Sequence, residues 1–169
     1  LEVADSDLAV LPGSRATLAG LRWLRESGIA EALVRRAADQ RPVLGICGGY
    51  QMLAEQITDG VESTLGTAAG LALLPVTVHF AADKTVDRPS GKAYGEPVTT
   101  AYEIHHGRTT LLPGAKAEPF LDGFQCGAVW GTTWHGAWES DGFRRAFLRD
   151  VAERAQRDFV PALDVEFAA

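Results

Sequence analysis

The sequence predicts an α/β fold with a mostly parallel central sheet, helices on both faces and some antiparallel edge strands. Three observations support this class. The compact runs LAVLPGS at 8–14 and PVLGI at 42–46 have the unbroken apolar character of strands that are buried on both faces. A helical pattern follows each of them, which is the alternation typical of a parallel sheet. Segments 70–80 and 98–112 alternate apolar and polar residues, as antiparallel or edge strands do.

Helical spacing of apolar residues follows each of the two buried runs. From Thr17 to Val34 the spacing is helical, and Gly28 is expected to divide this region into two short helices or one broken helix. The segment YQMLAEQI at 50–57 comes directly after the second run and is predicted to be a helix. A strong helical pattern also covers 140–159. Its apolar face consists of Phe143, Phe147, Leu148 and Val151.

The remaining segments carry weaker signals. AADKTVDRPSGKAYGEP at 81–97 is rich in Gly, Pro and charged residues, and it is predicted to be a loop. GAVWGTTWHG at 127–136 has the pattern of a strand that runs into a loop, and residues from about 160 form a C-terminal tail. We expect a single domain over 1–169. Because the chain starts at Leu1 with a strand-like segment, we also expect it to be a fragment of a longer protein.

Composition and charge exclude several classes of function. The formal net charge is −6, whereas binding a nucleic-acid backbone requires clustered Lys and Arg, so no nucleic-acid partner is expected. No apolar run approaches the length of a membrane span, and the N-terminus lacks the features of a signal peptide. The two cysteines are too few for a disulfide framework or a structural zinc site. We therefore expect no metal, no membrane contact and a reducing, cytoplasmic setting.

The cysteine at the end of the second apolar run carries the clearest chemical signal. Cys47 stands between Gly45 and Gly49 in the pattern G-x-C-x-G, the thiol counterpart of the G-x-S-x-G nucleophile elbow. A free cysteine is often only a small apolar filler, and that interpretation stays open for the residue taken alone. In an elbow a strained turn exposes the nucleophile, and the following helix directs N–H groups at the sulfur, which is expected to favour thiolate. The Gly48 amide would face a developing oxyanion.

A cysteine nucleophile requires a base, which in many enzymes is a histidine distant in sequence. His79 lies inside an alternating strand pattern and is expected to be structural. The adjacent His105 and His106 cannot both face one site. His135 lies in WGTTWHGAW at the end of a predicted strand, where catalytic groups collect in open α/β sheets. Spacing alone ranks His135 ahead of His105.

Four motifs occur in the order seen in a known enzyme family. They are LPGS at 11–14, GICGGYQML at 45–53, YEIHHGRT at 102–109 and WGTTWHG at 130–136. From about Asp5 to Phe159 the chain resembles the class I, triad-type glutamine amidotransferases with their flavodoxin-like fold, and more narrowly their CobB/CobQ-like branch. The resemblance implies hydrolysis of glutamine to glutamate and ammonia. It also implies a linked ATP-dependent synthetase domain, which uses the ammonia to amidate carboxylates of a corrinoid, adenosylcobyrinic acid diamide, in cobalamin biosynthesis.

The resemblance implies roles for individual residues. Cys47 would attack the glutamine carboxamide and form a glutamyl thioester, while His135 would transfer the protons. The amides of Gly13 and Gly48 would form the oxyanion hole. The implied residues of the glutamine pocket are Gln51, Tyr102, Glu103 and His105. An ordinary strand edge with a polar face would explain the YEIHHG segment equally well.

The sequence departs from the family pattern at three points. Classical members have an acid two residues after the histidine, but this position is Ala137, so a dyad forms or another acid, such as Glu103 or Glu139, orients the imidazole. The usual glycine before YEIH is Ala101. No G-x-x-x-x-G-K-[ST] motif occurs, so we expect no cofactor on this segment and assign ATP and Mg²⁺ to the synthetase domain.

Two alternatives to the corrinoid-amidating type remain. A related branch uses the same glutaminase to amidate a cell-wall lipid beside a Mur-ligase-like partner, and the long segment 82–109 favours the corrinoid type over it. The other alternative is a non-catalytic amidotransferase-like domain that binds or regulates a partner. Ala137 supports that alternative, whereas the presence of both Cys47 and His135 opposes it.

Overall fold

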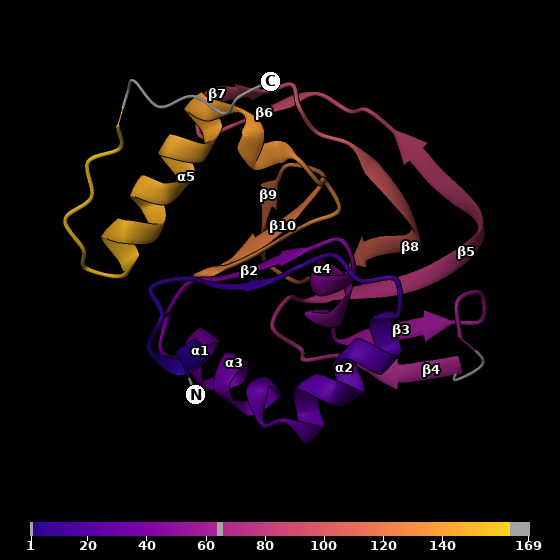
Figure 1. The fold of residues 1–169 in the computed structure, drawn as a ribbon. Helices are drawn as coiled ribbons and strands as arrows, with labels where there is room; N and C mark the ends of the chain where they lie inside the picture. Colours follow the sequence, from indigo (N-terminus) through magenta and orange to yellow (C-terminus); the bar gives the residue numbers. More distant parts are fainter. Residues whose placement is uncertain (1, 64–65, 163–169) are drawn as a thin grey trace.

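A five-stranded sheet in the order β1-β2-β11-β10-β9 forms the centre of the molecule (Figure 1). The computed structural model describes residues 2–63 and 66–162. β1, β2 and β11 are parallel, whereas β10 and β9 continue the sheet in antiparallel pairing. The bounds are Ala9–Leu11 for β1, Val43–Ile46 for β2, Glu118–Phe120 for β9, Gly123–Cys126 for β10 and Val129–Thr132 for β11. The predicted α/β class is confirmed.

Helices cover both faces of this sheet, with α1, α2 and α3 on one side and α5 on the other (Figure 1). They span Glu2–Asp5 (α1), Thr17–Glu26 (α2), Ile29–Ala38 (α3) and Asp141–Arg154 (α5). Successive residues of a strand point to opposite faces. Val43 of β2 therefore joins the apolar cluster of Leu21 and Leu33, whereas Leu44 joins the cluster of Phe147 on α5. Burial on two faces explains why β2 is apolar throughout.

Two of the predicted helical regions agree with the structure. Gly28 has a φ of 77°, in the left-handed region that glycine adopts without strain, and it separates α2 from α3. α5 occupies most of the predicted 140–159, and its apolar face is buried except for the partly exposed Leu148. From residue 163 onward, the predicted C-terminal tail lies outside the described residues.

The predicted helix at 50–57 is wrong in its second half. α4 covers only Gly48–Met52, and β3 begins at Gln56. The N–H of Glu55 donates to the carbonyl of Val76 at 2.9 Å, so pairing with the neighbouring strand replaces the next helical hydrogen bond. Long-range pairing therefore overrides the local helical pattern.

A second sheet, in the order β4-β3-β5-β8, lies beside the first (Figure 1). β5 and β8 pair antiparallel, as the alternating patterns predicted. The predicted loop at 81–97 is wrong, because β5 continues to Asp87 and a two-stranded sheet of β6 and β7 follows. Beyond Phe80 the side chains of β5 are mostly exposed, which gives this strand the composition of a loop. The bounds are Gln56–Asp59 (β3), Gly66–Ala69 (β4), Val76–Asp87 (β5), Gly91–Ala93 (β6), Glu96–Val98 (β7) and Glu103–Leu111 (β8).

The first residues form the helical turn α1 and not the expected strand-like segment. Arg36 of α3 is buried, and its guanidinium donates to the carbonyl oxygens of Val3, Ser6 and Pro42 at 2.9, 2.7 and 2.9 Å. One side chain thus ties the chain before β1 to the chain before β2.

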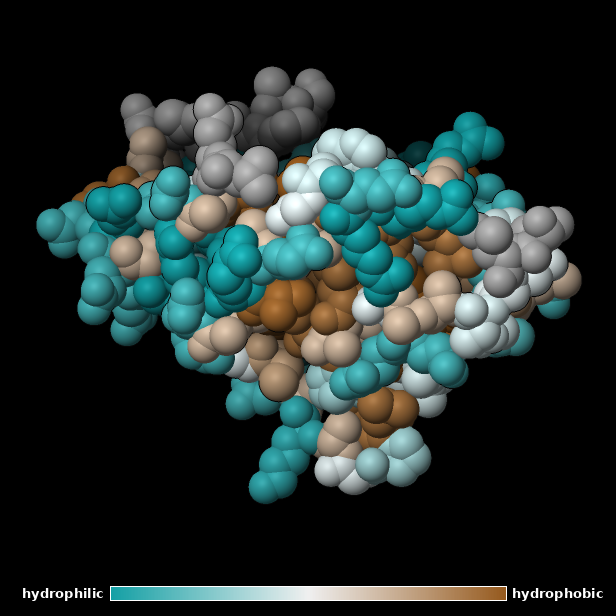
Figure 2. Space-filling view, turned by 90° about the horizontal axis from the view of Figure 1, so that it is seen from below, coloured by the Kyte–Doolittle hydropathy of each residue, from teal (hydrophilic) through white to brown (hydrophobic). Residues whose placement is uncertain are grey.

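Figure 2 looks onto the face that carries α1, α2 and α3, and it shows apolar side chains gathered in the middle of this face. A groove of about 380 Å³ runs between these helices and β1, with Val10 47% exposed and Trp23 58% exposed along it. Within the described residues, no strand pairs with the outer edge of β1. No helix in the same part of the chain combines the length and apolar character needed to cross a membrane.

Candidate active site

Cys47 directly follows β2 and stands where the strand turns into α4, at the carboxyl edge of the central sheet. Its φ of 50° and ψ of −111° form a combination that residues with a side chain adopt only under strain. Its N–H donates to the carbonyl of Thr132 at 2.8 Å, so the end of β11 holds the turn in place. A Cβ atom on Gly49 would lie 2.0 Å from the carbonyl oxygen of Leu11, which requires glycine there. The backbone is that of a nucleophile elbow.

The thiol of Cys47 does not have the acidity expected from the sequence. Burial raises its pKa, and the Gly48 N–H, which lowers the pKa, does not offset that effect. The expectation that the following helix favours thiolate is therefore wrong, because α4 is only five residues long and the sulfur is buried. Cys47 is a thiol at neutral pH, and its attack on a substrate requires a base.

The turn after β1 lies against the elbow and against His135. A Cβ atom on Gly48 would lie 2.7 Å from the carbonyl oxygen of Ser14 and 2.8 Å from its nitrogen, so the two backbones touch. A Cβ atom on Gly13 would lie 2.6 Å from Cε1 of His135. Three segments that are far apart in the sequence therefore meet at one edge of the sheet.

His135 lies just beyond β11, in a loop that pairs with the residue before β8. The Tyr102 N–H donates to the His135 carbonyl at 3.0 Å, and the His135 N–H donates to the Tyr102 carbonyl at 2.9 Å. The two rings stack, with centroids 5.0 Å apart and planes inclined by 13°. Burial lowers the pKa of His135, and the nearby His105 lowers it further. At neutral pH the imidazole is therefore uncharged and can accept a proton.

Neither acid considered from the sequence hydrogen bonds to the imidazole of His135. The position of the family's acid, Ala137, is fully buried in an apolar cluster at the start of the short helix η1 (Ala137–Glu139). Glu139 is exposed. Glu103 directs its carboxylate at the hydroxyl of Thr133, 3.2 Å away. Within the part of the chain that the structure describes, no side chain hydrogen bonds to the ring nitrogens of His135.

The loop that carries His135 is fixed by Asp122, a residue that the sequence did not single out. Asp122 lies between β9 and β10 and accepts a hydrogen bond from the Thr133 N–H at 3.0 Å. It also accepts from the hydroxyl of Thr132, which in turn accepts from the Trp134 N–H at 3.1 Å. The aspartate lies between two strands that were not predicted, so its sequence context was that of an ordinary turn residue.

His105 is held by its own set of contacts. Its Nδ1 lies 2.8 Å from the carbonyl oxygen of Gly107, which requires that Nδ1 carries the hydrogen. Its Nε2 lies 3.5 Å from the Glu103 carboxylate, too far for a strong hydrogen bond. With its hydrogen on Nδ1, His105 keeps Nε2 as its free acceptor, and this atom faces the Glu103 carboxylate.

A cavity of about 310 Å³ opens beside Cys47. Gln51 is buried at its wall, where its Oε1 accepts a hydrogen bond from the Thr17 hydroxyl at 3.0 Å. Of the four predicted pocket residues, Gln51 and His105 line this cavity, whereas Tyr102 and Glu103 do not. The lining residues are Ser14, Arg15, Cys47, Gln51, Glu62, Lys84, Ile104, His105 and His106.

Three charged residues that line the cavity were not predicted from the sequence. Arg15 and Lys84 are cationic and Glu62 is anionic, so both signs of charge border the space in front of the thiol. The pKa of Glu62 is raised, because the effects of burial and of the neighbouring Asp59 outweigh the lowering effects of Lys84 and Arg15. Only Arg15 had a signal, because it follows the LPGS motif, whereas Lys84 lies in the segment that was predicted to be a loop.

Comparison with known proteins places the chain in a family. The model of the CobB/CobQ-like glutamine amidotransferase domain matches residues 2–143. The cobyric acid synthase of Streptomyces coelicolor is 60% identical over 99% of this chain and 33% of its own length, and that of Streptomyces avermitilis is 61% identical over 99% and 32%. The chain thus spans about a third of the length of these curated relatives.

A solved structure described as a glutamine amidotransferase shares the fold, with a TM-score of 0.60, 19% sequence identity, and coverage of 89% of this chain and 79% of the other. The family predicted from the four motifs is confirmed, and with it the expectation of an enzyme. The chain belongs to the CobB/CobQ-like glutamine amidotransferase domain family.

Proposed function

We propose that the chain is the glutaminase domain of a cobyric acid synthase. It hydrolyses glutamine to glutamate and ammonia, and a synthetase domain outside this chain uses ATP and Mg²⁺ to transfer the ammonia onto carboxylates of a corrinoid. The names of the relatives and the third of their length that the chain spans support this assignment. They favour it over the alternative in which the glutaminase serves the amidation of a cell-wall lipid.

Cys47 and His135 carry out the first half of the reaction. The imidazole takes the thiol proton while the sulfur attacks the carboxamide carbon of glutamine, so that a C–S bond forms and the carbonyl oxygen becomes negative. The amides of Gly13 and Gly48 donate to this oxygen, and each such donor typically lowers the barrier by ~3 kcal/mol. The C–N bond then breaks, and His135 passes its proton to the departing ammonia.

Water completes the reaction through the same two residues. His135 removes a proton from water, which attacks the thioester carbonyl, and the C–S bond breaks. The sulfur recovers its proton from the imidazole, and glutamate leaves. The raised pKa of Cys47 and the lowered pKa of His135 match these roles, because the resting pair is then a neutral thiol and a neutral base.

The cavity in front of Cys47 has the charges that a free amino acid requires. Glutamine carries an α-ammonium group and an α-carboxylate, and in this proposal Glu62 receives the first while Arg15 and Lys84 receive the second. Gln51, held by Thr17, forms the inner wall.

The strained backbone of Cys47 at the edge of a polar cavity is the observation that carries the proposal. Its test is to treat the full-length protein with a diazo-ketone analogue of glutamine and to locate the adduct by mass spectrometry. We expect one adduct, at Cys47, which forms more slowly in the presence of excess glutamine. The Cys126→Ser variant is the control and should be labelled at the same rate. An unlabelled protein would support the non-catalytic alternative.

A further inference from the structure

The loop that carries His135 is joined along its length to the segment before β8. The hydroxyl of Thr100 donates to the Gly136 carbonyl at 2.7 Å, and the Thr99 N–H donates to the hydroxyl of Ser140 at 3.1 Å. The two hydrogen bonds between the backbones of Tyr102 and His135 complete this contact. The backbone of the histidine is therefore fixed, although among residues 2–63 and 66–162 no carboxylate hydrogen bonds to its ring.

The Tyr102 ring continues this contact at the level of the side chains. It stacks on the imidazole at a centroid distance of 5.0 Å. A Cβ atom on Gly136 would lie 3.4 Å from Cδ1 of Tyr102, so the tyrosine ring also lies over the neighbouring glycine. Gly136 has a φ of 68°, the left-handed conformation in which a side chain would be strained. This glycine thus permits the sharp turn beneath the tyrosine ring.

We infer that Tyr102 is a positioning residue for His135 and takes over the orienting role of the acid that Ala137 replaces. A carboxylate would restrain the imidazole through a hydrogen bond, whereas the tyrosine restrains it by contact over a flat face. The face of Tyr102 limits the tilt of the ring, and the close approach of Gly13 to Cε1 limits its swing toward β1. The inference rests on the proposed function, because it assigns Tyr102 a role in the reaction of Cys47 and His135.

Tyr102 contributes little to the packing of the apolar core, so its role in the reaction can be tested by substitution. Its side chain is 46% exposed, and it belongs to neither of the two apolar clusters. It also does not line the cavity in front of Cys47. Replacing the ring should therefore leave folding and glutamine affinity nearly unchanged and affect the alignment of His135.

The experiment compares Tyr102→Phe and Tyr102→Leu in the full-length protein, with Phe159→Leu as the matched control. Phe159 is likewise an exposed aromatic residue, 41% accessible, and lies beyond α5. We expect Tyr102→Leu to lower kcat for glutamine hydrolysis by about 10- to 100-fold with KM within about threefold, since a small misplacement of a catalytic group costs this much. Tyr102→Phe keeps the flat face and should remain within about threefold of the parent, as should Phe159→Leu.

A pH profile separates positioning from a general loss of structure. The titratable groups that face the imidazole are His105 of β8, the Tyr102 phenol and, in the proposed reaction, the Cys47 thiol. Removing the tyrosine ring exposes the imidazole to water, so the acidic limb of kcat/KM should move to higher pH in Tyr102→Leu and stay in place in Tyr102→Phe. A damaged fold would lower the whole profile without moving this limb.

The outcomes distinguish this inference from the proposed function. If Cys47→Ser is inactive with glutamine and Tyr102→Leu keeps the parent kcat and pH profile, the inference is wrong and the proposed function stands. A loss of activity in Tyr102→Phe equal to that in Tyr102→Leu would also overturn it, because the phenol and not the stacked face would then be required. If Cys47→Ser retains glutaminase activity, the proposed function itself fails.

Discussion

The two cysteines of this chain lie at opposite ends of the central sheet and in opposite environments. Cys47 follows Ile46, which pairs with Thr132 at the carboxyl end of β11, whereas Cys126 pairs with Val129 at the beginning of β11. Cys47 is buried on a strained backbone, and Cys126 is exposed at the end of an antiparallel strand. The exposed thiol is the easier one to reach, yet only the buried one stands on a strained elbow that is hydrogen bonded to the start of the loop that carries His135.

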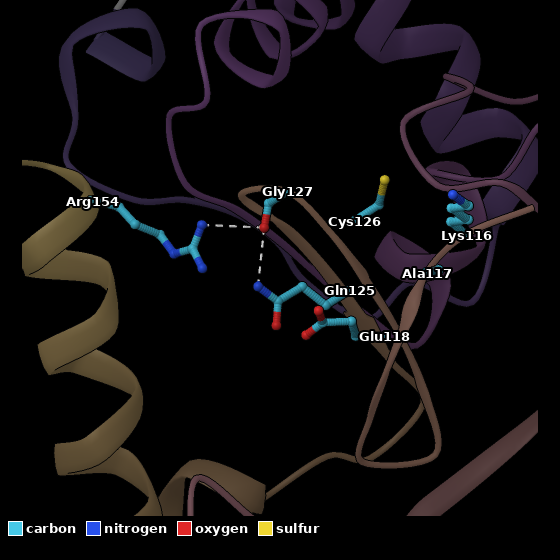
Figure 3. A pocket seen from close by; sticks show the side chains of 7 residues that line it. All are labelled: Lys116, Ala117, Glu118, Gln125, Cys126, Gly127 and Arg154. Atoms are coloured by element: carbon cyan, nitrogen blue, oxygen red, sulfur yellow. Dashed lines mark hydrogen bonds between the residues drawn. The ribbon is translucent and has the colours of Figure 1, made fainter.

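The cavity at Cys126 is the larger of the two, at about 500 Å³ compared with about 310 Å³. In Figure 3, Arg154 and Gln125 of this cavity both direct donors at the Gly127 carbonyl, at 3.3 and 3.0 Å. Arg154 also lies over the Trp130 ring and binds Asp150. Arg154 is thus engaged within the protein, and Cys126 ends an ordinary antiparallel strand, whereas Cys47 stands on a strained turn. Backbone geometry and position on the sheet therefore identify the reactive thiol better than exposure or cavity size.

The largest expected effect is that of Cys47→Ser on the glutamine-dependent reaction. We expect the rate to fall by at least about 10³-fold, since the removal of a nucleophile takes away the covalent route. Amidation with added ammonium salt should be unchanged in the full-length protein, because only the nitrogen source is lost. Rates with glutamine and with ammonia, measured on the same preparation, test this expectation. An equal loss of both would show that Cys47 is structural, and the contrast with Cys126 would then disappear.

Replacing His135 with asparagine should have the next largest effect, about 10²- to 10⁴-fold, as is typical for a general base. In the parent protein the lowered pKa of His135 implies that the neutral, active imidazole persists below the ordinary histidine pKa. The acidic limb of kcat/KM should therefore have its midpoint below pH 6.5. A midpoint above this value would mean that another group supplies the base. His79→Asn, in an exposed position of β5, is the matched control and should leave the profile unchanged.

Gly13→Ala tests whether the turn after β1 belongs to the site. The new Cβ atom would lie 2.6 Å from Cε1 of His135, so the imidazole must move, and we expect kcat/KM to fall by about 10- to 100-fold. Stability toward urea should change little, because Gly13 is exposed and its neighbour in this contact is a movable side chain. Gly60→Ala is the control, since nothing lies within 4 Å of its Cβ position. Full activity of Gly13→Ala would remove this turn from the site.

The parts of the fold that were predictable are those determined by neighbours in the sequence. The elbow at Cys47 was predictable from Gly45 and Gly49, because crowding at a sharp turn restricts both positions to small residues. The separation of α2 from α3 at Gly28 is likewise determined locally, by the left-handed backbone conformation of this glycine. β9 and β10 left no comparable signal, since they are only three and four residues long.

The parts of the site that were not predictable depend on contacts between distant segments. Glu62 and Lys84 come from the second sheet and its connections, and their approach to Cys47 follows from how that sheet lies beside the first. Asp122 acts on Thr133 across a hairpin that was not anticipated. The stacking of Tyr102 on His135 results from one bridge between two loops. The family resemblance implied that Tyr102 belonged near the site, but not that it contacts the base.

The smallest expected effect is that of Cys126→Ser, which tests the other cysteine of the comparison. The side chain is exposed, and the exchange of a thiol for a hydroxyl keeps its size, so we expect kcat and KM for glutamine within about twofold of the parent and stability within about 0.5 kcal/mol. A thiol-specific maleimide should modify Cys126 faster than Cys47 in the parent protein, and this modification should not inhibit glutamine hydrolysis. Inhibition that follows the labelling of Cys126 would mean that the two ends of the sheet are coupled, and exposure would then have been the better guide to function.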